Sequence, residues 1–378
     1  MTPKIAIVHD WFITYAGAER VVEQMLQVFP QADLFALLDF MTGPERGMLQ
    51  GKPVRTSFLQ TFPFLNRRNY RNFLPLMPLA IEQLDVSGYD VVLTNCHAVS
   101  KGVITSPEQL HISYIHTPMR YAWDMQNDYL TVSGMKSLKS ALARLILHYI
   151  RLWDSAAANR PDVLYGNSAF ICRRIEKIYR RKAEVLYPPV NTDYFAFHPE
   201  KEDFYLTASR LVPYKRIDLI VETFATLPER QLVVIGDGPE ARKLQSLNLP
   251  NVRWLGFQPN DVLRATMQRA RAFIFAAKED FGIVPLEAQA CGTPVIAFGE
   301  GGALETVIGL DAERPTGVFF QEQTVEALRA AILQFEQEQT RFAPAACRAN
   351  AERFSNQRFR QEIQQIVETR WQSFRFRS

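Results

Sequence analysis

Two cationic side chains stand five positions apart in the second half of the sequence, where they could bind a diphosphate. Arg210 and Lys215 follow residues 204–208, an apolar run that is typical of a short buried strand. A guanidinium group offers a planar fork of donors and an ammonium group a point charge, and both suit phosphate oxygens. The alternative is a pair of solvated surface cations, and for these two residues taken alone the alternative is favoured.

Two carboxylates lie in a second segment, which also follows an apolar run. Glu279 and Glu287 come after residues 271–277 and stand on either side of a Gly-Ile-Val-Pro turn. Pro285 suits the first position of a helix, and no Ser, Thr, Asp or Asn immediately precedes it to cap the free amides. The segment therefore predicts amides that are open to an anion. Alternatively, Glu287 only complements the helix dipole and Glu279 is a solvated loop acid.

The two segments together describe one kind of ligand. In open α/β sheets, ligands bind beyond the carboxyl ends of the strands, where loops lead into helices, and both segments occupy such places. The cations suit a diphosphate, the free amides suit its oxygens, and the carboxylates suit sugar hydroxyls. This combination predicts a site for a nucleotide-sugar.

The rest of the sequence predicts the sheets that must position these segments. Short apolar runs alternate with helical stretches in both halves, and continuous apolarity suits strands that are covered on both faces. We therefore predict two doubly wound α/β domains, residues 1–190 and 204–354, joined by the Pro-rich, charged linker 188–203 and followed by a helix over 355–378. The expected strands are 5–9, 34–38, 90–94, 111–115, 163–167 and 184–187 in the first domain, and 204–208, 232–235, 252–255, 272–275, 294–297 and 317–320 in the second.

A long helix is expected over residues 136–153. Its large apolar residues recur at helical spacing, with basic residues between them, which predicts an amphipathic helix. The apolar residues are Leu138, Leu142, Leu145, Tyr149 and Trp153, and the basic ones are Arg144, His148 and Arg151.

The composition excludes several classes of protein. The chain has 378 residues, 47% of them hydrophobic and 22% charged, which is typical of a soluble globular protein of two domains. No apolar run is long enough to span a membrane, and no signal peptide is evident, so we expect a cytoplasmic protein. The cysteines are far apart, which argues against a zinc site or a disulfide framework and predicts no metal. They are Cys96, Cys172, Cys291 and Cys347.

Positive charge is concentrated in the first half. Residues 1–190 hold 21 Lys and Arg against 16 Asp and Glu, whereas residues 191–378 hold 22 against 24. The segment 55–73 interleaves four arginines with five aromatic residues. Such a segment could stack on a nucleic acid, but a membrane surface or a lipid diphosphate suits it better. The alternative is a solvated surface segment whose aromatic rings are buried in the core.

The combined motifs resemble a known family. The pattern R-x4-K is followed some seventy residues later by E-x7-E within E-D-F-G-I-V-P-L-E-A-Q-A-C-G-T-P-V-I-A, which is similar to glycosyltransferase family 4. The members of this family are retaining enzymes with the GT-B fold. The resemblance covers nearly the whole chain. It implies two Rossmann-like domains that face a central cleft, with a C-terminal helix that returns to the N-terminal domain.

The resemblance also implies roles for residues of the second domain. Arg210 and Lys215 match a pair that binds the diphosphate, Glu287 matches the residue that holds the ribose hydroxyls, and Glu279 matches one that holds hydroxyls of the transferred sugar. The backbone amides near the phosphates and sugar correspond to Phe281, Gly282 and Ile283.

In the first domain the resemblance implies a phosphate-facing loop and a catalytic histidine. Gly17 lies in the family's glycine-rich loop, although Ala16 stands where the family often has a second glycine. His116 matches a histidine that contacts the donor sugar and the transition state; the alternative is a structural histidine with satisfied hydrogen bonds. The residues that follow could line the acceptor side, namely Arg120, Tyr121, Trp123 and Asp124.

One motif imitates a different cofactor site. Residues 236–241 satisfy the spacing G-x-G-x-x-A of the dinucleotide fingerprint after an apolar run. That fingerprint also needs an acidic residue at the end of the next strand, whereas this run ends at Phe257. The resemblance instead makes Gly236 and Gly238 part of a turn near the nucleotide, and Phe257 part of a wall beside the base. A nicotinamide-dependent oxidoreductase is therefore only a rival hypothesis.

Several expectations about substrate and location follow from the resemblance. The blocks H-D-W…G-A-E-R and S-R-L-V-P-Y-K-R-I-D are similar to bacterial mannosyltransferases of polysaccharide assembly. They imply GDP-mannose as donor and a polyprenyl-diphosphate-linked saccharide as acceptor, at the inner face of the membrane, with no metal and no cofactor besides the donor. Alternatives are a UDP-sugar donor and a catalytically idle protein that binds a nucleotide-sugar.

Overall fold

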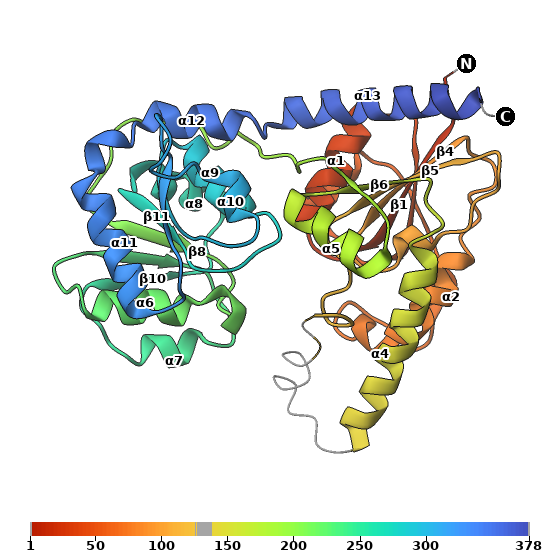
Figure 1. The fold of residues 1–378 in the computed structure, drawn as a ribbon. Helices are drawn as coiled ribbons and strands as arrows, with labels where there is room; N and C mark the ends of the chain where they lie inside the picture. Colours follow the sequence, from red (N-terminus) through yellow and green to blue (C-terminus); the bar gives the residue numbers. More distant parts are fainter. Residues whose placement is uncertain (1, 125, 127–137, 377–378) are drawn as a thin grey trace. The chain divides into compact units, whose positions relative to one another are not determined.

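The chain folds into two compact units. The computed structural model describes residues 2–124, 126 and 138–376, so residues 136 and 137 of the expected long helix lie outside the described part. One unit comprises Met1–Pro188 with Phe359–Ser378, and the other comprises Pro189–Arg358. Each is an α/β layered structure (Figure 1). No helix in the described part has both the length and the apolarity that a bilayer crossing requires.

The first unit is built on a seven-stranded parallel sheet with the order β3-β2-β1-β4-β5-β6-β7. The direction of strand addition reverses between β1 and β4, so this is the switch point at which such sheets bind ligands. The strands are β1 (Ile5–Phe12), β2 (Asp33–Asp39), β3 (Val54–Thr56), β4 (Val91–Cys96), β5 (Leu110–Ile115), β6 (Val163–Gly166) and β7 (Glu184–Val185).

Both faces of this sheet are covered, as the continuous apolar runs predict. Ile5 and Ile7 pack into one buried cluster, with α1 and α13, while Ala6 and Val8 pack into another, with α2 and α4. Side chains that alternate along β1 thus serve two cores. The helices are α1 (Gly17–Val28), α2 (Met77–Glu82), α4 (Leu138–Ala157), α5 (Ala169–Tyr179) and α13 (Asn356–Arg375), with short 3-10 turns η1 (Gly43–Leu49), η2 (Phe58–Thr61), η3 (Tyr70–Leu76) and η4 (Ser100–Gly102).

The last helix of the chain belongs to the core of the first unit. Phe359, Ile363 and Val367 of α13 are buried in the same cluster as residues of β1 and α1. Arg360 donates from Nη1 to Gln24 Oε1 at 2.7 Å, which adds a polar contact between α13 and α1.

Helix α4 differs from the amphipathic pattern that its sequence shows. Leu142, Leu145 and Tyr149, which recur at helical spacing, are exposed on its outer face. Its buried face is formed instead by other apolar residues, of which Leu147 and Ile150 are fully packed into the cluster shared with α2. The helix is therefore apolar on two sides.

The second unit has a six-stranded parallel sheet with the order β10-β9-β8-β11-β12-β13. Its switch point lies between β8 and β11, and its two faces are again covered by separate clusters. The strands are β8 (Tyr205–Ala208), β9 (Leu232–Ile235), β10 (Val252–Gly256), β11 (Ala272–Phe275), β12 (Val295–Phe298) and β13 (Gly317–Phe320). The helices are α6 (Ile217–Ala225), α7 (Ala241–Gln245), α8 (Asn260–Arg269), α9 (Ile283–Ala290), α10 (Ala303–Thr306), α11 (Val325–Gln337) and α12 (Pro344–Glu352), with 3-10 turns η5 (Pro213–Lys215) and η6 (Gln339–Arg341).

The Pro-rich segment before β8 packs against the second unit. Lys201 Nζ donates to the carbonyl oxygens of Gln268 and Cys291 at 2.8 and 3.0 Å and to Thr293 Oγ1 at 2.9 Å. The segment is thus held by hydrogen bonds and is part of the second unit.

A buried histidine in β5 should make the first unit sensitive to acid. Burial lowers the pKa of His111 to about 3, and the positive charges of Arg160 and Arg181 act in the same direction. The unfolded chain binds a proton at this residue below about pH 6.5 and the native unit does not, so stability should fall as the pH drops from 6.5 towards 3. Between pH 6.5 and 5 we expect the free energy of unfolding of the wild type to fall more steeply with decreasing pH than that of His111→Gln, by about 1.4 kcal/mol per pH unit. Thermal melting curves at a series of pH values measure this difference. Parallel pH profiles would contradict this assignment.

Candidate functional site

The second unit brings together two of the predicted site residues that are far apart in sequence. Lys215 ends η5, after β8, and Glu279 lies four residues beyond β11. Because β8 and β11 are neighbours in the parallel sheet, the loops that follow them meet at its carboxyl edge. Lys215 Nζ and Glu279 Oε1 form an ion pair whose side chains are 18% and 20% exposed. A ligand at this edge could reach both groups.

Arg210 supplies a second cation in the same loop. It lies two residues after β8, and its side chain is exposed. Within the described residues its guanidinium group makes no hydrogen bond or ion pair. It is therefore available to an anion.

The glycine turn after β9 supports the loop that carries these cations. A Cβ atom on Gly236 would lie 1.8 Å from Ser209 O, and one on Gly238 would lie 2.3 Å from Leu211 O, so only glycine fits at either position. Leu211 N also donates to Asp237 O at 2.9 Å. The G-x-G spacing thus has a packing reason in this chain. Phe257, past the end of β10, is 81% exposed, so its ring is accessible.

The start of α9 differs in register from the sequence-based expectation. The helix begins at Ile283, so Pro285 is its third residue and not its first. Gly282 is the N-cap residue, has φ 92°, and makes no side-chain capping bond. The amides of Ile283 and Val284 therefore precede Pro285, which has no amide hydrogen.

A second glycine pair, which the sequence-based reasoning did not assign, holds the acidic segment. Gly302 N donates to Glu279 O at 2.8 Å, and a Cβ atom on Gly302 would lie 2.3 Å from Phe281 Cα. The Phe281 side chain is buried against Phe354, with ring centroids 5.6 Å apart. The signal for this contact in the sequence was the pair Gly301-Gly302, which follows β12.

Glu287 is a buried acid and not a surface one. It is the fifth residue of α9, and only 2% of it is exposed. Burying a carboxylate is costly unless polar groups surround it. The helix dipole favours acids mainly in the first turn, and Glu287 lies beyond that turn. Its position and burial therefore argue against the interpretation that Glu287 only complements the helix dipole.

The first unit has a cluster of histidines and carboxylates at the carboxyl edge of its own sheet. Asp10, on β1, is fully buried and accepts four backbone hydrogen bonds of 2.6–2.9 Å from residues 97–100, which follow β4. Burial acts to raise the pKa of Asp10, but the neighbouring His97 and His9 and these N–H groups bring it below its usual value. Asp10 is therefore ionised at neutral pH.

A buried His–Glu pair lies beside Asp10. His9 Nε2 is 3.4 Å from Glu19 Oε1, and Glu19 also accepts a hydrogen bond from Ala16 N at 3.0 Å. Burial acts against charge on both groups, yet their contact raises the pKa of His9 and lowers that of Glu19. The pair links β1 to the first turn of α1, where Gly17 is the first helical residue.

The neutral ring of His116 is held in one tautomer by its neighbour Asn95. Asn95 Nδ2 donates to Ala18 O at 2.9 Å, so its Oδ1 must accept from His116 Nε2, at 2.8 Å. Burial, together with the charges of His97 and His9, places the pKa of His116 well below its usual value. His116 is therefore neutral and carries its proton on Nε2. Its Nδ1 atom makes no hydrogen bond with a described residue and is left as an acceptor.

His97 completes the cluster and is partly open to solvent. Its Nδ1 atom lies 3.0 Å from Asp10 Oδ2, an electrostatic contact without hydrogen-bond geometry, and its side chain is 24% exposed. Its ring packs edge to face against the ring of Trp11, with the two ring centroids 4.6 Å apart. His9, Asp10 and Trp11 belong to the H-D-W block that resembles the family, but the sequence alone assigned them no role. The signal that could have indicated this cluster was the presence of polar residues at the end of the first apolar run.

The residues after His116 make contacts within the first unit. Trp123 Nε1 donates to Asp154 Oδ2 at 2.8 Å, and Asp154 is buried beneath them with Lys101 as its ion partner. Asp124 Oδ1 accepts from Arg174 Nη2 at 2.6 Å. Tyr121 and Arg120 are partly buried in the same turn. An acceptor role for these four residues stays a prediction.

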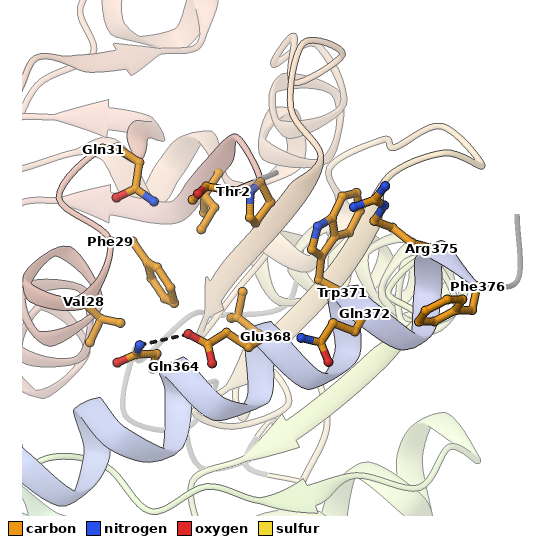
Figure 2. Close-up of a pocket in the computed structure, with 13 residues that line it drawn as sticks. Thr2, Val28, Phe29, Gln31, Gln364, Glu368, Trp371, Gln372, Arg375 and Phe376 are labelled. Carbon is orange, nitrogen blue, oxygen red and sulfur yellow. Dashed lines mark hydrogen bonds between the residues drawn. The ribbon is translucent and has the colours of Figure 1, made fainter.

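A pocket of about 740 Å³ lies at the opposite edge of the first unit. Figure 2 shows its wall on α13, with Trp371 and Gln372, and Phe29 at the end of α1 facing it. Thr2 and Ile5 place the pocket at the amino end of β1, whereas the histidine cluster lies at the carboxyl end. It contains none of the predicted site residues.

Comparison with known proteins finds a family match within the second unit. Residues 193–354 match the family described as Glycosyl transferases group 1. The chain is 24% identical over 249 residues to an uncharacterized glycosyltransferase of Methanocaldococcus jannaschii, and the alignment covers 62% of this chain and 70% of that protein.

A second relative has a named donor. The chain is 34% identical over 161 residues to the GDP-mannose-dependent monoacylated alpha-(1-6)-phosphatidylinositol monomannoside mannosyltransferase of Corynebacterium glutamicum. This alignment covers 38% of the chain and 41% of the relative, so it spans less than half of either protein.

A solved structure shares the fold. HepE of Anabaena, in complex with UDP-glucose, superimposes with a TM-score of 0.68 at 17% identity, over 97% of this chain and all of that one. The expectation of two Rossmann-like domains is thereby confirmed.

Proposed function

We propose, from the match of residues 193–354 to the family Glycosyl transferases group 1, that this chain is a glycosyltransferase that moves mannose from GDP-mannose to a lipid-linked saccharide. The proposed acceptor is a polyprenyl-diphosphate-linked saccharide of bacterial polysaccharide synthesis, met at the inner face of the membrane. No metal and no cofactor besides the donor are part of this proposal.

The pairing of Lys215 with Glu279 carries the proposal. It places a group that suits a diphosphate beside a group that suits sugar hydroxyls, at the switch point of a group 1 domain. In the absence of substrate each group neutralises the other. A nucleotide-sugar could take both, because its phosphates would contact the cation and its hydroxyls the carboxylate.

The chemistry proposed for the site is stabilisation of a departing diphosphate. Breaking the bond to the anomeric carbon leaves negative charge on the diphosphate, which Arg210, Lys215 and the first amides of α9 would stabilise. We propose retention of configuration, in which the departing phosphate helps to remove the proton of the acceptor hydroxyl. No side chain is assigned as a covalent nucleophile.

His116 is proposed to orient the transferred sugar as a neutral hydrogen-bond acceptor. Its Nε2 proton is already engaged by Asn95, so Nδ1 could accept from a sugar hydroxyl. A neutral ring also suits a transition state that gathers positive charge on the sugar, since an imidazolium ion would repel it. The low pKa of His116 keeps the ring neutral at physiological pH.

The two candidate donors, GDP-mannose and a UDP-sugar, are supported to different degrees. The relative from Corynebacterium glutamicum is named as GDP-mannose-dependent and is 34% identical over the aligned region, which favours GDP-mannose. The complex of HepE with UDP-glucose belongs to a protein only 17% identical, so it keeps a UDP-sugar as the second candidate without favouring it.

Nucleotide binding tests the proposal directly. We expect GDP to raise the melting temperature of the wild-type chain, because a ligand that binds only the native state stabilises it by about 2.7 kcal/mol at a concentration of 100 Kd. UDP, ADP and NAD at the same concentration should raise it less. A rise in melting temperature with UDP alone would replace GDP-mannose by a UDP-sugar as the proposed donor. A rise with NAD alone would favour an oxidoreductase and refute the proposal.

Transfer of labelled mannose from GDP-mannose to a membrane extract separates an enzyme from an idle binding protein. An idle protein would show the GDP shift but no transfer.

A further inference from the structure

The outer face of α4 carries apolar side chains where a surface helix is ordinarily polar. Leu142, Leu145, Tyr149 and Leu152 are three or four residues apart and are 58%, 65%, 48% and 61% exposed. The opposite face of the helix is buried in the core, so these residues form a second apolar stripe. An exposed stripe of this kind marks an interaction surface.

A second set of exposed apolar residues lies in the segment 58–71. Phe58, Phe62 and Phe64 are 40%, 38% and 90% exposed. Phe64 has φ 65°, a left-handed conformation that residues other than glycine rarely adopt. Among the interpretations of residues 55–73, burial of the aromatic rings in the core holds for Tyr70 but not for these three phenylalanines.

The two sets belong to the same layer of the first unit. Leu59, from the phenylalanine segment, is buried in the same cluster as Leu147 of α4. Helix α2, which follows that segment, is tied to α4 by a hydrogen bond of 2.8 Å from Trp153 Nε1 to Glu82 Oε1. Figure 1 shows α2 beside α4.

The exposed charged side chains within residues 46–81 and within α4 are all positive. Residues 46–81 contain six Lys and Arg and no Asp or Glu. The single acid of α4, Asp154, is buried and paired with Lys101. The side chains of Arg67, Arg68 and Arg144 are exposed and make no hydrogen bond or ion pair within the described part of the chain.

We infer that the apolar stripe of α4 and the segment 58–71 dock the first unit on an anionic lipid bilayer. The apolar side chains would enter the interface while the unpaired arginines meet the headgroup phosphates. A second copy of the chain suits this surface less, because an isologous contact would bring the same arginines against one another. The inference deepens the proposed function, since it assigns the surface that would meet a lipid-linked acceptor.

Sedimentation with sucrose-loaded vesicles tests the docking surface. We expect the full chain to bind vesicles of phosphatidylcholine with phosphatidylglycerol, and to bind phosphatidylcholine alone much more weakly. The variant Arg67→Gln/Arg68→Gln/Arg144→Gln should lose about fivefold in affinity per cation removed. The variant Leu142→Gln/Leu145→Gln should also bind less, and its residual binding should be more sensitive to salt.

Matched variants on the second unit serve as controls. Arg253→Gln/Arg314→Gln/Arg329→Gln removes the same charge from other exposed arginines, and Leu247→Gln/Leu304→Gln replaces leucines that are 48% and 55% exposed. Both controls should bind vesicles like the wild type. Equal vesicle binding by the arginine variant or the leucine variant and its matched control would overturn the inference. So would a wild-type dimer in gel filtration that the Leu142→Gln/Leu145→Gln variant converts to a monomer.

The vesicles contain neither donor nor acceptor, so this test is separate from that of the proposed function. A chain that binds anionic vesicles but transfers no mannose would refute only the proposed function. A chain that transfers mannose but does not bind the anionic vesicles would refute only the docking surface.

Discussion

Replacing Lys215 with alanine should lower mannose transfer by about 10²–10³-fold and leave the fold intact, because the charge that meets the departing diphosphate is lost. The ion pair with Glu279 is partly solvated, and such pairs contribute at most about 1 kcal/mol to stability. The melting temperature without ligand should therefore hardly change, whereas the shift caused by GDP should shrink. Initial rates with GDP-mannose and melting curves with GDP measure the two effects.

A nearby ion pair provides the control for this substitution. Lys278, in the loop that carries Glu279, pairs with Glu300, which follows β12, and both of those side chains are about half exposed. Lys278→Ala removes the same charge one residue before Glu279 and should keep most of the transfer activity. Wild-type transfer by Lys215→Ala would refute the site, and equal losses in the two variants would show a general effect of charge.

Replacing Glu279 with alanine should separate nucleotide binding from sugar transfer. The carboxylate is proposed to hold hydroxyls of the transferred sugar, and each hydrogen bond to a charged group contributes about 1.5–3 kcal/mol, so transfer should fall by about 10²-fold or more. Affinity for GDP should not fall, because Lys215 loses its internal partner and is free for the phosphates. Titration of GDP by calorimetry, beside rate measurements, tests both expectations.

The matched variant Glu300→Ala removes an acid from the neighbouring ion pair and should change neither quantity strongly. A parallel loss of GDP affinity and transfer in Glu279→Ala would assign Glu279 a different role. It would then position Lys215 and would not contact the sugar.

The sequence by itself determined the class of fold and the edge of each sheet at which the predicted site residues had to lie. Apolar runs of strand length, alternating with helical stretches, leave few options other than parallel sheets covered on both faces, and in such sheets all strands end at one edge. Arg210, Lys215, Glu279 and Glu287 follow strands, so their place at that edge could be predicted from local pattern alone. The proposed class of ligand, a nucleotide-sugar, was inferred from the chemistry of these side chains.

Only the tertiary structure decided which of these residues meet. Lys215 contacts Glu279 because β8 and β11 are neighbours, and the order of strands depends on long-range packing that no local pattern records. The cluster of Asp10 with residues after β4 arises in the same way. Helical spacing likewise predicted the stripe of α4 but not its direction, because a helix with two apolar faces can bury either one, and the packing of the whole unit selects between them.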